Sequence, residues 1–212
     1  MIRLLYGLFA ADVLIHLASS VFGWKIPQRI TKILLLPLLL GIYLCGTERI
    51  FITIVPALFF GWCGDILLLK SSDRRFFTLG LASFLLGHLC YIPAFLSAAE
   101  RFNLPVLLVS LAAAVPLGFA VHLFIRPDKA MTVPTVAYEV VIELMSIAAL
   151  QLFLFRNDGA GMLIFTGALF FMISDTILGF FTFHGNPRYG TFLVMLTYIA
   201  AQGSIVAGLV RI

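Results

Sequence analysis

The amino-acid sequence predicts an all-α fold, a polytopic membrane bundle of eight transmembrane helices. Apolar residues occupy 62% of the 212 positions and charged residues only 11%, against roughly 45–50% and about 25% in an ordinary soluble domain. The apolar residues are gathered into runs close to the ~20 residues that a helix needs to cross the hydrocarbon layer. Eight such helices leave about 26 residues for each helix with its connection. We therefore expect short loops and a single domain over residues 1–212.

Eight hydrophobic runs follow one another along the chain, and short polar segments separate them. Continuous apolar runs of this length favour spanning helices over buried strands. We expect helices over residues 2–22, 31–46, 50–69, 76–98, 104–125, 134–155, 160–183 and 189–210. The connections between them are residues 25–29, 47–49, 70–75, 100–103, 126–129, 156–159 and 184–188.

The first run has one feature of a cleaved signal peptide, because Ala18-Ser19-Ser20 resembles a cleavage site. However, Asp12 and His16 would interrupt the apolar core of such a signal. We therefore interpret residues 2–22 as the first helix of the bundle.

The distribution of lysine and arginine predicts the orientation, since these residues favour cytoplasmic loops. The odd-numbered connections hold nine of them, whereas the even-numbered connections and the two termini hold five. Both termini are thus expected on the non-cytoplasmic side of a bacterial inner (cell) membrane, in which the protein is integral and multi-pass. The nine are Lys25, Arg29, Lys32, Lys70, Arg74, Arg75, Arg126, Lys129 and Arg188; the five are Arg3, Arg49, Arg101, Arg156 and Arg211.

The net charge and the cysteines do not indicate a nucleic-acid-binding protein or a cysteine-ligated metal site. A net charge of +4 can indicate a nucleic-acid partner in a soluble protein, but here the cations lie at helix ends and are expected to anchor the loops. Cys45, Cys63 and Cys90 lie inside apolar runs and lack the spacing of metal ligands. We expect them to act as small apolar packing residues.

Polar residues within the runs are the candidates for function. A central Asp costs roughly 2.5–3.5 kcal/mol on translocon scales, so such a residue usually lines a cavity or meets a partner. At 1.5 Å per residue, Asp65 lies ~7 Å and Asp175 ~12 Å from the ends of their helices, so much of the polar set converges on the cytoplasmic half. The candidates are Asp12, His16, Lys32, Asp65, His88, His122, Glu139, Glu143 and Asp175, with Tyr91, Tyr138, Tyr198 and Gln202 as uncharged companions.

Helical spacing places several of these residues on common faces. Asp12 and His16, at i and i+4, are expected to form a local pair, and Glu139 and Glu143 share a face as second-rank candidates. Gly61, one turn before Asp65, predicts the close approach of another helix or a ligand. The other stripes suit either a pocket for an amphiphile or hydrogen bonds between helices. They are Phe84, His88, Tyr91 and Phe95; Tyr138, Ile142 and Met145; and Met195, Tyr198 and Gln202.

A set of motifs extends from the third run to the eighth. It consists of Gly64-Asp65-Ile66-Leu67-Leu68, residues 77–91 ending in Gly87-His88-Leu89-Cys90-Tyr91, Tyr138 with Ile142 and Met145, residues 167–178 containing Ser174-Asp175-Thr176, and Tyr198-Ile199-Ala200-Ala201-Gln202. In content and order this set resembles the YhhN-type lysoplasmalogenases. The second run departs from the family's Lys-Pro pattern, because Ile33 follows Lys32 and Pro37 lies further on.

The resemblance implies a membrane hydrolase of lysoplasmalogens, which are lysophospholipids with a vinyl ether at sn-1. Its products would be a long-chain aldehyde and a glycerophospho-ethanolamine or -choline. Asp65 and Asp175 correspond to the catalytic pair, and no metal ion or organic cofactor is required. The expected partners are the lysophospholipid and membrane lipid, with no nucleic acid and no protein partner implied. We expect the substrate-binding residues to be Lys32, His88, Tyr91, Tyr138, Tyr198 and Gln202.

The chemistry of vinyl ether hydrolysis suits two carboxyl groups. Protonation of the β-carbon is slow and leaves an oxocarbenium ion, to which water adds before the hemiacetal collapses. A neutral carboxylic acid would supply the proton, and an ionised partner would stabilise the cation and orient the water. Glycosidases divide a similar cationic transition state between two carboxyl groups. The sequence leaves open which Asp is the acid.

Three other interpretations remain open at this stage. The two aspartates could serve only as ion-pair or hydrogen-bonding groups between helices. A proton-coupled transporter of a lipid or amphiphile would use buried carboxylates as a proton relay, although no matching pair of broken helices is evident. A metal-dependent membrane amidase would need ligands among His16, His88, His122 and His184, which lack a His-x3-His pair. We expect most of these histidines to be hydrogen-bonded within the bundle.

Overall fold

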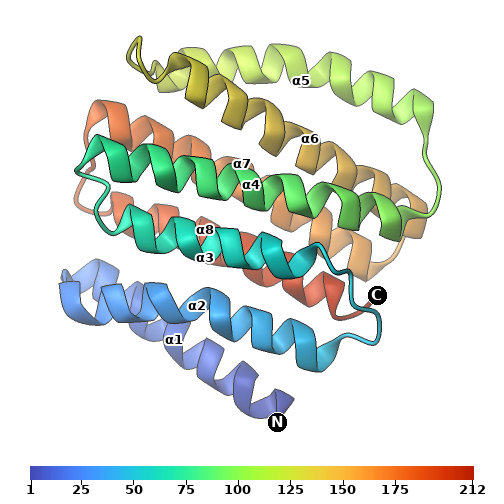
Figure 1. Ribbon diagram of the computed structural model, residues 1–212, viewed down its shortest axis with the longest axis horizontal. Coiled ribbons are helices and arrows are strands. Elements are labelled where there is room, and N and C mark those ends of the chain that lie inside the picture. Colours follow the sequence, from blue (N-terminus) through green and yellow to red (C-terminus); the bar gives the residue numbers. More distant parts are fainter.

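The computed structural model describes residues 1–212 as eight α-helices without a β-strand. The chain passes back and forth, so that the α1–α2, α3–α4, α5–α6 and α7–α8 connections lie at one end and both termini at the other (Figure 1). We refer to the end with these four connections as the basic end, because it carries the nine cations assigned above to the odd-numbered connections. The helices are α1 (Ile2–Phe22), α2 (Lys25–Gly46), α3 (Ile54–Leu68), α4 (Arg74–Ala99), α5 (Leu104–Ile125), α6 (Thr132–Arg156), α7 (Gly159–His184) and α8 (Gly190–Leu209).

The predicted all-α class and the number of helices are confirmed, with two differences in length. α2 begins at Lys25 rather than at residue 31, because Pro27 falls in its first turn, where a missing N–H is tolerated. α3 has only 15 residues, about 22 Å at 1.5 Å per residue, since residues 50–53 precede the helix. There the Phe51 N–H donates to the Tyr43 hydroxyl (2.7 Å).

Seven helices are long and apolar enough to cross a membrane, and α3 is the exception. Large apolar side chains on the outer surface are exposed, among them Leu14, Phe59 and Val115. Polar side chains are buried inside, including Asp65 and His88 at 1% exposure each. This distribution reverses that of a soluble protein and indicates an integral membrane protein, since lipid solvates apolar surface whereas charged groups need partners.

Seven of the helices form a ring. Successive contacts run from α1 through α2, α3, α4, α6, α7 and α8 back to α1. α5 lies outside the ring and contacts only α6 and α7 (Figure 1), and Ile125 is its one buried residue. The interior of the ring is therefore where the polar faces of α3, α4, α6, α7 and α8 can meet.

A proline within α2 helps to fix its neighbour α3. Pro37 has no N–H, so the carbonyl of Ile33 one turn earlier is left without its helical donor. The Trp62 indole N–H of α3 donates to this oxygen (2.9 Å). This bond ties α3 to the half of α2 that carries Lys32.

Gly167 lies where α7 and α8 make the most extensive contact of the bundle. A Cβ at this position would be 2.8 Å from the Ala201 carbonyl oxygen and 3.0 Å from the Ile205 nitrogen. Because backbone cannot move aside as a flexible side chain can, we expect Gly167→Val to destabilise the fold by about 1–3 kcal/mol or more. The thermal unfolding midpoint in detergent measures this loss. Gly7→Val is the control, since nothing lies within 4 Å of an added Cβ there; equal midpoints for the two variants would contradict this packing.

Candidate active site

All eight residues that we expected at the site lie in the interior of the ring, in three hydrogen-bonded groups. The first surrounds Asp65 of α3, whose side chain is 1% exposed. The Lys32 ammonium of α2 lies 3.4 Å from Asp65 Oδ1, and the Tyr198 hydroxyl of α8 donates to Oδ2 (2.7 Å). Both carboxylate oxygens thus have a partner that favours their negative charge.

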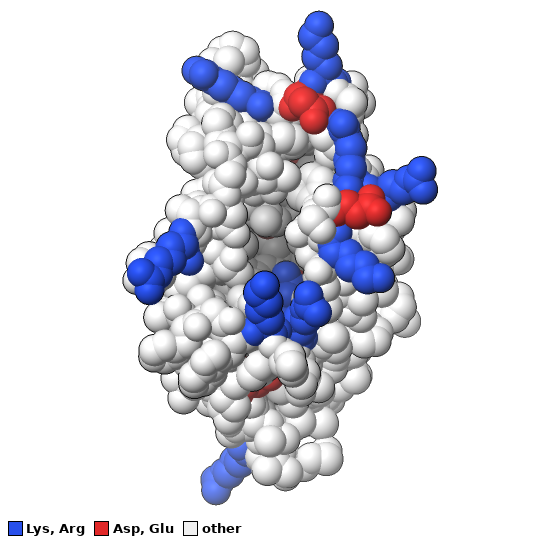
Figure 2. Space-filling model, turned by 90° about the vertical axis from the view of Figure 1, so that its left-hand side faces the viewer, with Lys and Arg blue, Asp and Glu red and all other residues white.

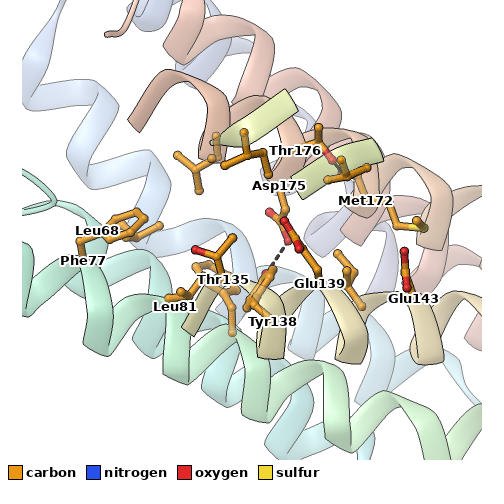
Figure 3. Close-up of a pocket in the computed structure, with 16 residues that line it drawn as sticks. Leu68, Phe77, Leu81, Thr135, Tyr138, Glu139, Glu143, Met172, Asp175 and Thr176 are labelled. Carbon is orange, nitrogen blue, oxygen red and sulfur yellow. Dashed lines mark hydrogen bonds between the residues drawn. The ribbon is translucent and has the colours of Figure 1, made fainter. Parts of the chain in front are cut away.

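The second group surrounds Asp175 of α7. The Tyr138 hydroxyl of α6 donates to Asp175 Oδ2 (Figure 3), and His88 Nε2 of α4 lies 2.8 Å from the same hydroxyl. Because Tyr138 gives its single proton to Asp175, His88 must donate through Nε2, which leaves Nδ1 without a proton. His88 and Tyr138 therefore hold one oxygen of Asp175 in place and leave the other free to carry a proton.

The third group joins α4 to α8 away from the two aspartates. The Tyr91 hydroxyl donates to Gln202 Oε1 (2.8 Å), and both side chains are 1% exposed. The expected close approach at Gly61 also occurs here, since a Cβ there would be 2.8 Å from Leu36 and 3.6 Å from the Gln202 amide nitrogen. Tyr91 and Gln202 contact each other and line none of the cavities described below.

The two aspartates share a small cavity of about 30 Å³, which is enough for one or two water molecules. Lys32 and Tyr198 line it as well. It stands between two other cavities that each share part of its lining. Asp65 and Asp175, far apart in sequence, are thus brought to one buried space.

The cavity on one side is polar and lies toward the basic end. Its volume is about 360 Å³, and Lys32 lines both it and the small cavity. Figure 2 shows this end of the bundle, where lysine and arginine side chains surround a hollow. The polar residues that line the cavity besides Lys32 are Ser71, Ser72, Thr182, Asn186 and Thr191. Four of these lie in or next to connections, and we had not predicted any of the five for the site because nothing in their spacing marks them.

The cavity on the other side is narrow and mostly apolar, with a volume of about 60 Å³. Asp175 lines both this pocket and the small cavity, and Phe77, Leu81 and Met172 contribute apolar surface (Figure 3). A polar cavity, two carboxyl groups and an apolar pocket therefore follow one another through the bundle.

One predicted pair is wrong. His16 does not pair with Asp12, because α2 packs against α1 and brings Thr31 Oγ1 to 2.8 Å from His16 Nδ1. Asp12 Oδ2 is buried without a partner.

Glu139, a second-rank candidate, lines the apolar pocket together with Asp175 and lies 3.3 Å from His122. Its position next to Tyr138 in the sequence was the signal that could have ranked it higher.

The histidines are hydrogen-bonded within the bundle, as expected. Their partners are Thr31 for His16, Tyr138 for His88, Glu139 for His122 and the Phe180 carbonyl for His184. No three residues among His, Cys, Asp and Glu lie in a group that could hold a metal ion. The donor set that a metal-dependent amidase would need is therefore not assembled. Cys45, Cys63 and Cys90 are free thiols.

Comparison with known proteins agrees with the motifs. The YhhN family model matches residues 28–209, a range that covers α3 to α8 and nearly all of α2. Asp65, Asp175 and the residues that contact them all fall within it. No curated protein and no solved structure matches the chain. The chain belongs to the YhhN family.

Proposed function

We propose that this protein is a lysoplasmalogenase, which cleaves the sn-1 vinyl ether of a lysoplasmalogen to a fatty aldehyde and glycerophospho-ethanolamine or -choline. One observation carries the proposal: two carboxyl groups, one buried (Asp65) and one partly buried (Asp175), line one small cavity, and only Asp65 has a lysine partner. Membership of the YhhN family supports a membrane hydrolase. Such a pair has the two protonation states that vinyl ether hydrolysis needs.

The partners of the two aspartates divide the roles between them. Asp65 is ion-paired with Lys32 and accepts from Tyr198, so we assign it as the ionised group. Asp175 has no Lys or Arg within 4.0 Å, and it lines the apolar pocket, where a neutral acid is favoured over a charged one. We therefore assign Asp175 as the acid, with Tyr138 and His88 as the residues that position it.

The reaction then proceeds in three steps. Asp175 gives its proton to the β-carbon, so the C=C π electrons form the new C–H bond and leave a C–C single bond. A lone pair of the ether oxygen forms the C=O⁺ bond of the oxocarbenium ion, and the Asp65 carboxylate stabilises this cation. Water adds to the α-carbon and passes a proton to Asp65, which forms the hemiacetal. The hemiacetal then collapses: its hydroxyl proton passes through water to the glycerol oxygen as the bond between that oxygen and the α-carbon breaks, and the hydroxyl oxygen becomes the aldehyde carbonyl. The products are aldehyde and alcohol, and water is the one co-substrate.

The cavities on either side define where the substrate would lie. The phosphate is expected near Lys32, with Ser71, Ser72, Asn186 and Thr191 as hydrogen-bonding neighbours. The first carbons of the alkenyl chain are expected in the apolar pocket beside Phe77 and Met172. Hydroxyl, amide and ammonium donors suit a phosphate, whereas aromatic and thioether groups suit a chain.

A direct assay tests the proposal. Purified protein in detergent should release fatty aldehyde from a lysoplasmalogen and little fatty acid from the matching ester lysophospholipid, because the sequence has no Gly-x-Ser-x-Gly elbow to supply a serine nucleophile. Aldehyde and fatty acid are measured in the same reaction. Dominant ester cleavage would exclude the mechanism above. No hydrolysis, together with proton-driven uptake of the lipid by vesicles that contain the protein, would favour a transporter instead.

The eight helices are proposed to form one domain in a bacterial inner (cell) membrane. The short helix α3 would span this membrane as a member of the ring, between α2 and α4. The nine cations at the basic end support a cytoplasmic location for that end. A reporter fused after Ile212 should therefore report a non-cytoplasmic C-terminus. A cytoplasmic C-terminus would reverse the orientation and move the aspartates to the outer leaflet.

A further inference from the structure

Two carboxyl groups outside the proposed catalytic pair separate two cavities. Glu139 and Glu143, one turn apart on α6, are the residues that line both the apolar pocket of Asp175 and a groove between α5 and α6. The groove has a volume of about 440 Å³ and is otherwise lined by His122 and apolar or glycine residues. The wall between the groove and the pocket therefore carries ionisable groups where apolar ones would cost less.

Glu139 is the better placed of the two to move a proton. Its side chain is largely buried, Oε1 has no hydrogen-bond partner, and Oε2 lies 3.3 Å from His122 Nδ1. The side chains of Glu139 and Asp175 face the same pocket (Figure 3). Glu143 instead packs against α5, where a Cβ on Gly118 would be 2.8 Å from its Oε1.

The charged and titratable groups around Glu139 come from every neighbouring helix. His122 faces Glu139 from α5, and Asp175 faces it from α7. Tyr138 and Glu143 are its neighbours on α6, and His88 of α4 is hydrogen-bonded to Tyr138. Its one ion-pair partner is His122, within 4.0 Å. Glu139 can thus exchange a proton with His122 on one side and with the pocket on the other.

Depth orders these groups from the basic end inward. His122 lies three residues from the end of α5, ~5 Å at 1.5 Å per residue, and Glu139 seven residues from the start of α6, ~10 Å. Asp175 lies nine residues from the end of α7, ~14 Å. A proton entering near the membrane surface would meet His122 first, then Glu139 and then Asp175.

We propose that Glu139 is a proton-relay residue, which returns a proton to Asp175 after each turnover and is itself reloaded through His122. This inference rests on the proposed function. Each turnover leaves Asp175 without its proton and gives Asp65 the proton of the attacking water. Asp65 releases that proton toward the polar cavity beside Lys32, and Asp175 takes one from Glu139. The exchange needs no reactant besides water and bulk protons.

Separating the first turnover from later ones tests the relay. With enzyme in excess, Glu139→Gln should form aldehyde within about twofold of the wild-type rate, because in the proposed mechanism the first turnover needs no proton from Glu139. With substrate in excess, the steady-state rate should fall by roughly 10²-fold, after a burst of one aldehyde per enzyme. His122→Gln should show the same burst with a smaller loss, and acetic acid should partly restore the steady-state rate of Glu139→Gln.

Glu143→Gln is the matched control and should keep both rates. A loss of the first turnover equal to that of the steady state, in Glu139→Gln protein with a wild-type unfolding midpoint, would assign Glu139 to structure or chemistry and overturn the relay. Unchanged rates in Glu139→Gln and His122→Gln would overturn it as well. If the wild-type protein releases no aldehyde, the proposed function itself fails, so the two failures are distinguishable.

Discussion

Replacing either proposed catalytic carboxyl with an amide is expected to lower aldehyde release by a factor of order 10²–10⁴, the range for a proton-transfer role. Asp175→Asn removes the transferable proton, and Asp65→Asn removes the negative charge that stabilises the oxocarbenium. The double variant should be little worse than either single one, because groups that act as a unit are strongly non-additive. Steady-state kcat on a lysoplasmalogen is the measurement.

Asp12→Asn provides the matched control for this experiment. Asp12 is also an aspartate buried within a helix of the bundle, at 6% exposure, but it lies on α1 away from the shared cavity. It should retain wild-type turnover. Substantial hydrolysis by folded Asp65→Asn or Asp175→Asn protein would remove that residue from the mechanism. Loss of folding in both would assign the aspartates to holding the helices together.

Lys32→Met is expected to destabilise the protein more than Asp65→Asn does. Asp65 is 1% exposed, so loss of Lys32 leaves a buried charge without its ion-pair partner, which typically costs about 3–5 kcal/mol. Loss of the Asp65 charge is milder, because the Lys32 side chain is 17% exposed and also lines the polar cavity. Thermal or denaturant unfolding in detergent measures the difference.

The double variant identifies the cause of that loss. Adding Asp65→Asn to Lys32→Met removes the unpaired charge, so it should recover much of the lost stability while leaving the protein inactive. If the double variant is instead less stable than Lys32→Met, the two side chains do not form the ion pair described here.

Lys32→Met also tests the proposed phosphate site. If the folded variant binds the lysophospholipid as tightly as the wild type does, the phosphate does not bind at Lys32.

The shared faces of the candidate site were predictable because helical periodicity decides which residues lie on one side of a helix. Phe84, His88, Tyr91 and Phe95 were expected on one stripe of α4, and all four are buried. The partner of each residue was not predictable. His88 meets Tyr138 because α5 lies outside the ring and α4 packs directly against α6, an arrangement that no periodicity within a single helix can reveal.

Length and periodicity by themselves determined the eight helices, the membrane character and the inward polar faces, since these depend on local composition and on the solvent around each helix. Only the tertiary structure decided which groups became partners. His16 meets Thr31 instead of Asp12, and the same packing of helices gives Lys32 to Asp65 and leaves Asp175 without a lysine. Hydrogen bonds and ion pairs act over a few ångströms. The proposed division of roles between the two aspartates therefore depends on which helices come into contact around the ring.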